Sequence, residues 1–301
     1  MATKNGRRGR WIRVLGWVAV CWVSGPDPSF ADPIVGVGPT TLFSLGTAVR
    51  GLGVYTRLSD GGNRLTIWEA PVLALYSPRR DLNVALSLPY VSKNLTLEDG
   101  RQRGAEGVGD LRLFGLYRFF RQDRPHGTIE ATLLGGLKLP TGDSGRRDAQ
   151  GRLPPALQPG SGSVDGLVGL NLGSISRRWG LYLGALGKVN SAARGFKAGD
   201  MVSYDLTVQY QLFPDWPIPD LSQFNVGLEL VGTTATEDRV GGTSVSESGG
   251  TEFFLAPGFQ YFLGPQWLIE AAVELPISRG LERPLGLKPD VIVIWGFRGV
   301  F

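Results

Sequence analysis

The chain has 301 residues, of which 31 are basic and 27 acidic, and it contains 44 glycines and one cysteine. Without an amino-terminal leader that holds five basic residues and one acidic residue, 26 of each remain, so no net positive field favours nucleic acid as a partner. The one cysteine, Cys21, lies in that leader, which excludes a disulfide framework, thiolate chemistry and a cysteine metal site from the remainder.

The first 31 residues have the pattern of a secretory signal peptide. Basic residues as far as Arg13 precede a short apolar run at 14–23, and Ser29-Phe30-Ala31 is a small-x-small cleavage pattern. A transmembrane helix needs about twenty apolar residues, roughly twice the length of this run. We therefore expect a signal peptide at 1–31, a Gly/Pro-interrupted periplasmic lead-in at 32–45 and a single β domain at 46–301.

Apolar residues alternate with other residues along most of the chain after position 46, which predicts strands. The alternation is clearest at 202–212 and 267–277, and it is weakest at 46–57 and 64–77, where neither face can be assigned. The pattern predicts about twelve strands, at 46–57, 64–77, 81–93, 107–121, 127–140, 163–175, 178–190, 200–213, 222–235, 250–263, 266–278 and 288–301.

The last of these strands indicates a membrane barrel. Its residues from Val291 to Gly299 present apolar and aromatic side chains at every second position, and the chain ends on an aromatic residue, Phe301. Termini of soluble domains tend to fray, whereas a barrel must pair its last strand with its first. We expect this strand to be recognised by the barrel-assembly machinery.

Connection lengths support the same architecture. Tight turns such as 176–177 and 264–265 alternate along the chain with long polar connections such as 94–106, 141–162 and 236–249. This layout is typical of outer-membrane barrels, with short turns on the periplasmic side and long loops outside. Two connections fit less well, because 59–63 is short and 214–221 is long.

Aromatic residues are predicted at both ends of the strands, as at membrane interfaces. The fold class predicted is all-β, a transmembrane antiparallel up-and-down barrel of about twelve strands in contact with outer-membrane lipid. The alternative is a soluble β-sandwich, whose strands also alternate and whose aromatic residues fill a core.

Charged residues fall on the faces predicted to point inward, because a charge facing lipid at mid-depth costs roughly 2–4 kcal/mol. One interpretation is a salt-bridged network that fills the lumen. The other is a narrow polar conduit whose charges set selectivity. The candidate lumen-lining residues are Arg112, Arg118, Glu130, Lys138, Asp165, Lys188, Asp205, Glu229, Glu252, Glu270, Glu274 and Arg298.

Signals for catalysis are weak. The one histidine, His126, lies in a predicted turn with no nucleophile signature nearby, whereas barrel lipases need a histidine–serine pair. Gly107-Val108-Gly109-Asp110 begins like a dinucleotide fingerprint, but Arg112 stands where a third glycine is required. We therefore expect no enzyme activity, no cofactor and no metal site.

Two segments carry a resemblance to a known family. Gly107 to Leu111 leads into a strand that ends at Tyr117-Arg118-Phe119, and Leu134 to Asp143 (LGGLKLPTGD) follows on the next strand. With the leader and the terminal strand, they resemble the outer-membrane transporter family associated with the meta-pathway of phenol degradation. The resemblance implies a barrel in the outer membrane of a Gram-negative-type bacterium that lets small organic solutes, including aromatic or hydrophobic ones, cross passively. The alternative is a closed barrel whose outer loops act as a binding surface.

Overall fold

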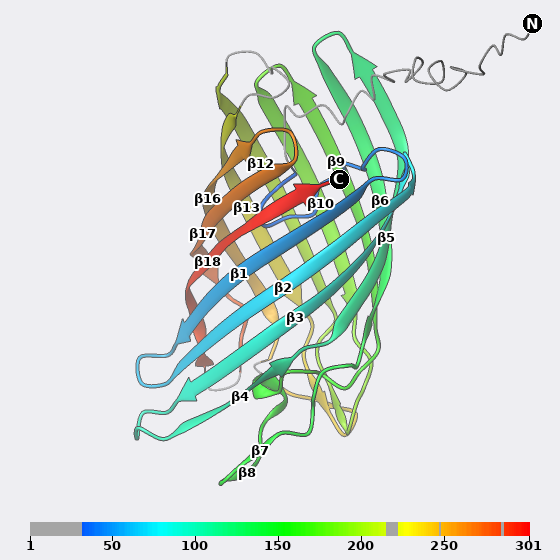
Figure 1. Ribbon diagram of the computed structural model, residues 1–301. Coiled ribbons are helices and arrows are strands. Elements are labelled where there is room, and N and C mark those ends of the chain that lie inside the picture. The colour runs from blue at the N-terminus through cyan, green and yellow to red at the C-terminus, as the bar shows by residue number, and fades with distance from the viewer. Residues whose placement is uncertain (1–31, 215–221, 247, 284–285) are drawn as a thin grey trace, which may run out of the picture.

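The computed structural model describes residues 32–214, 222–246, 248–283 and 286–301, and the predicted signal peptide lies outside them. Twelve long antiparallel strands form a closed barrel in the described part of the chain, because β1 pairs with β2 on one side and with β18 on the other (Figure 1). The long strands are β1 (Thr47–Ser59), β2 (Arg64–Arg79), β3 (Leu82–Thr96), β5 (Leu111–Arg124), β6 (Gly127–Leu139), β9 (Asp165–Ser176), β10 (Trp179–Val189), β12 (Met201–Phe213), β13 (Gln223–Ala235), β16 (Gly250–Leu263), β17 (Trp267–Arg279) and β18 (Lys288–Val300).

The barrel fold predicted from the alternation is confirmed. The barrel closes where its first strand, β1, pairs with its last strand, β18. The Thr47 amide donates a hydrogen bond to the Phe301 carbonyl at 2.8 Å, and the Phe301 amide returns one to Thr47 at 2.8 Å. We call this end of the barrel, where the tight turns lie, the turn end, and the opposite end the loop end. The described strands are accompanied by a short 3-10 turn, η1 (Pro155–Leu157). No described helix has the length and apolar character that crossing a membrane would require.

The outer surface of the barrel is apolar. Outward positions carry exposed leucine and valine side chains, such as Leu133, Leu137 and Leu181. Aromatic residues gather at both ends: Trp267 makes an edge-to-face contact with Phe301 at the turn end, with ring centroids 5.3 Å apart, and further pairs lie at the loop end. An apolar exterior bordered by two aromatic bands is the surface of a barrel that spans a membrane.

One strand position is divided between two segments. β4 (Gln102–Val108) pairs with the loop-end half of β3, and β5 pairs with its turn-end half. Gly109 and Asp110 separate them, and the Gly109 amide donates to the Pro89 carbonyl at 2.8 Å. The sequence predicted one strand at 107–121 and a loop at 94–106; that loop boundary was wrong, because β3 continues to Thr96 and β4 returns along it.

The long connection at 140–164 folds over the loop end of the barrel. It contains a short hairpin, β7 (Arg147–Asp148) and β8 (Gly151–Arg152), followed by η1. Leu153 and Leu157 from this connection are buried in a cluster with inward-facing residues of the first three strands. The other short strands, β11 (Phe196–Lys197), β14 (Arg239–Val240) and β15 (Thr243–Ser244), form a separate small sheet among the loops.

Truncation of one leucine should release this cap. We expect Leu157→Ala to cost about 2–5 kcal/mol of local packing, because the side chain is 2% exposed and leaves a cavity. Trypsin should then cleave faster after Arg147, while the barrel retains its folded mobility in an unheated gel. Val240→Ala, at an exposed loop residue, is the control; equal cleavage of both variants would contradict the packing role.

Candidate functional site in the barrel lumen

The segment 32–45, which the sequence predicted as a lead-in, lies inside the barrel (Figure 1). Its amides at Ile34, Val35 and Gly36 donate hydrogen bonds to the Glu229 carboxylate at 2.7, 3.2 and 3.2 Å. Further along, the Thr132 hydroxyl donates to the Pro39 carbonyl at 2.6 Å. Because Glu229 and Thr132 belong to strands on different sides of the lumen, these bonds hold the segment across the barrel interior.

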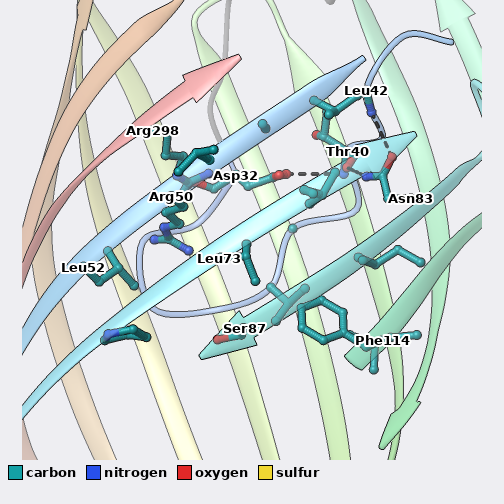
Figure 2. A pocket seen from close by; sticks show the side chains of 18 of the residues that line it. Asp32, Thr40, Leu42, Arg50, Leu52, Leu73, Asn83, Ser87, Phe114 and Arg298 are labelled. Atoms are coloured by element: carbon teal, nitrogen blue, oxygen red, sulfur yellow. Dashed lines mark hydrogen bonds between the residues drawn. The ribbon is translucent and has the colours of Figure 1, made fainter. Parts of the chain in front are cut away.

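Both ends of this inserted segment are held near the turn end. Arg298 donates to the Pro33 carbonyl at 2.9 Å, and the Leu42 amide donates to the Asn83 side-chain oxygen at 3.3 Å. Figure 2 shows the curved backbone between Asp32 and Leu42, with the Thr40 amide directed at the Asp32 carboxylate, 3.3 Å away. Burial raises the pKa of the Asp32 carboxyl, and the positive charge of Arg298 opposes that rise.

Beside the inserted segment, the lumen contains a cavity of about 530 Å³. Its wall is mainly aliphatic and comes from neighbouring strands; Leu73 and Phe114 on this wall are visible in Figure 2. The volume lies within the range of small-molecule pockets, roughly 300–1,000 Å³. The apolar wall residues are Leu52, Leu73, Leu75, Phe114, Leu116, Leu134, Leu167, Leu186 and Met201.

The strand registers place all twelve charged residues predicted from the sequence on the lumen side. Nine of them have charged partners or are bound by the inserted segment. Lys138, Asp165 and Lys188 lie together with Asp110; Glu270 and Arg298 with Arg50; Arg118 and Glu130 with Arg121; Glu252 with Arg283; and Glu229 with the backbone of 34–36. Asp205 and Glu274 lie on the inward face of β12 and β17. Arg112 also points inward, and no other described residue forms a hydrogen bond or ion pair with it.

Few of these charges border the cavity. Arg112, Lys138 and Lys188 line it nearer the loop end, and Arg298 lines it near the turn end, beside Arg50. Of the other predicted residues, Asp165 pairs with Lys138 and Lys188, Glu252 pairs with Arg283, and Glu229 binds the inserted segment. The aliphatic wall was not predicted from the sequence. Its signal was the weak alternation in the first two strands, because both faces of these strands are apolar.

The charged groups near the loop end form a tight cluster. Lys138 lies 2.9 Å from the Asp110 carboxylate and 2.8 Å from that of Asp165, and it also contacts the Ser161 hydroxyl. Lys188 approaches Asp165 at 3.5 Å. The Asp110 carboxylate further accepts the Gly142 and Ser161 amides, at 3.1 and 2.8 Å. This cluster therefore joins the barrel wall to the start and end of the long connection at 140–164.

Among the described residues, no group of three or more His, Cys, Asp or Glu side chains is arranged so that it could hold a metal ion. His126 is exposed in the turn between β5 and β6, and its carbonyl accepts a hydrogen bond from the Arg177 amide at 2.8 Å. The candidate site in the described part of the chain is the cavity with its charged borders.

Comparison with solved structures found the following similarities. The COG4313 outer membrane channel from Pseudomonas putida F1 is 16% identical, with a TM-score of 0.65 over 90% of this chain and 100% of that one. The β domain of the Bordetella autotransporter BrkA is 12% identical over 85% and 99% of the two chains, with a TM-score of 0.49. The CymD monoaromatic hydrocarbon channel is 12% identical over 90% and 99%, with a TM-score of 0.37.

No curated protein matches the sequence. A family profile does: the family described as "Putative MetA-pathway of phenol degradation" matches residues 72–279, which include most strands of the barrel and both segments that carry the resemblance. The match covers well over half of the chain. The chain therefore belongs to this family.

Proposed function

We propose that this chain is an outer-membrane channel through which small apolar organic solutes cross passively by way of the lumen cavity. The observation that carries the proposal is the cavity of about 530 Å³ within a membrane-spanning barrel, with a wall built mainly from leucine. Such a wall gives an apolar solute a favourable environment at about 25 cal/mol per Å² of apolar surface buried. The family description and the similarity in fold to a bacterial outer-membrane channel support the same conclusion.

The orientation follows from the fold. The turn end, with the two ends of the barrel sequence, faces the periplasm, and the long connections face outward. The terminal strand with Phe301 would be the element recognised by the barrel-assembly machinery. The protein would act without catalysis: the cavity is bordered by ion pairs, and the exposed position of His126 in a turn suits no hydrolytic site.

Filling the cavity tests this function. In bacterial cells that lack their own porins, expression of the protein should speed the uptake of 4-ethylphenol about tenfold. Leu73→Trp should return uptake to the level of cells without the protein, because the larger ring occupies the cavity. The matched control is Leu86→Trp, at an exposed outward position of β3, which should leave uptake unchanged. Equal uptake by Leu73→Trp and the unmodified protein would refute passage through the cavity.

The loop-presenting alternative gains less support. Part of the longest connection is buried as a cap: Leu157 packs against the barrel mouth, and Lys93 donates to the Ala156 and Gln158 carbonyls, each at 2.9 Å. These contacts hold this part of the connection against the loop end of the barrel.

A further inference from the structure

The cavity has one feature that a purely apolar solute would not use. Arg112 lines it on the inward side of β5, and its guanidinium forms no hydrogen bond or ion pair with any residue in the described part of the chain. Arg112 is exposed, although it lies inside the barrel. An arginine carries five donors in a planar fork and stays protonated, so this position offers an unused anion-binding group.

The surroundings of Arg112 leave a surplus of positive charge. Lys138 is its direct cross-strand partner on β6, and like charges directly opposite on a sheet are destabilising. Asp110 and Asp165 lie near enough to Lys138 and Lys188 to form ion pairs with them. Three cations therefore face two carboxylates, and one positive charge, on Arg112, remains unmatched.

An apolar wall lies directly beside this charge. Phe114, two residues along the same strand, lines the cavity, as do Leu167 on β9 and Leu186 on β10, further round the barrel wall. On the flanking β3 strand, the cross-strand neighbour of Arg112 is Ser87, another polar side chain at the cavity border. A ligand that satisfies both parts needs one planar anionic group and an apolar body.

We propose that the cavity binds small monocarboxylates with an apolar ring or chain, the carboxylate pairing with Arg112 and the apolar part lying against the leucine wall. This inference rests on the proposed function, since it names a solute class for the same cavity. The guanidinium fork matches the two oxygens of a carboxylate, and this pairing also removes the repulsion between Arg112 and Lys138. Lys188 contributes a second, weaker attraction, because Asp165 already lies 3.5 Å from its amine.

Isothermal titration of the refolded protein tests the carboxylate directly, with 4-ethylbenzoate and the equally shaped but uncharged 4-ethylbenzamide as probes. The unmodified protein should bind the benzoate about tenfold more tightly than the amide. Arg112→Gln should abolish that preference and leave the affinity for the amide within about twofold. Arg112→Lys, which retains the charge without the fork, should lie between the two.

Two controls isolate the effect. Arg118→Gln makes the same change at a lumen-facing arginine that is not among the cavity-lining residues, and it should keep the full preference for the benzoate. Folding of each variant is checked by its heat-dependent gel mobility. Should Arg112→Gln fail to fold, Lys188→Gln replaces it and should reduce the preference about threefold.

Equal binding of the two probes by the unmodified protein, or a preference that survives Arg112→Gln, would overturn the carboxylate proposal. Cellular uptake of 4-ethylbenzoate and of 4-ethylbenzamide separates this failure from failure of the channel function. Uptake without any carboxylate preference leaves the channel standing and removes the inference. A preference for carboxylate with no uptake of either probe supports the binding site and refutes transport.

Discussion

Deletion of residues 33–44 is expected to turn the protein into an open channel, with ion conductance in planar bilayers about fivefold higher or more. These residues occupy the middle of the lumen, where Pro33 and Pro39 are completely buried. We expect their removal to open a path along the inward charged residues of β12, β13 and β17. Because Asp205, Glu229 and Glu274 would then face water, the open channel should select cations.

A point variant provides the graded control for this result. Glu229→Gln weakens the hydrogen bonds from the amides of Ile34, Val35 and Gly36, because hydrogen bonds to a charged acceptor are stronger than those to a neutral one. We expect brief openings in single-channel records, with the same conductance as the deletion variant. Deletion with no rise in conductance would show that the lumen is closed elsewhere.

Replacement of Lys138 by methionine should cost the largest amount of stability of any single substitution in the lumen, about 3–5 kcal/mol. The methionine retains the aliphatic stem but leaves Asp110 and Asp165 without their shared cation, and the side chains of these acids are 7% and 1% exposed. Urea unfolding of the refolded barrel, followed by tryptophan fluorescence, measures the loss.

The matched control is Lys197→Met. Lys197 also pairs with an aspartate, Asp200 at 2.9 Å, but both side chains are partly exposed in the loops, and such pairs contribute about 1 kcal/mol or less. A further variant that combines Lys138→Met with Asp110→Asn and Asp165→Asn should recover part of the stability, because neither buried carboxylate is then left without Lys138. Equal unfolding midpoints for the two methionine variants would contradict the role given to the cluster.

Strand positions could be predicted from the sequence wherever one face is polar. At 202–212 the inward residues Ser203, Asp205 and Gln209 contrast with outward tyrosine and valine, so both the strand and its facing were evident. In β1 and β2 the inward residues include Leu52 and Leu73, which are as apolar as their lipid-facing neighbours. The alternation is lost there because the cavity wall and the lipid favour the same side chains.

The inserted segment could not be predicted for a different reason. Residues 32–45 are short, rich in glycine and proline, and without periodicity, and what places them is a set of long-range bonds to residues such as Glu229 and Thr132. The break between β4 and β5 is similar, since it depends on the contact of Asp110 with Lys138 and on the bond from Gly109 to Pro89. The inward charges were predictable one by one, but not which of them would border the cavity.

The course of the inserted segment has a consequence for reversibility. Pro33 is held by Arg298 and Leu42 by Asn83, both near the turn end, so the described segment extends into the barrel and turns back toward the same end (Figure 2). Because residues 32–45 belong to no strand, this segment can withdraw and return without breaking any strand pair. The hydrogen bonds that hold it need only offset the entropy of ordering a short stretch, about 1–2 kcal/mol per residue. The lumen can thus be opened and closed reversibly by this segment, while the strand pairing of the barrel wall stays intact.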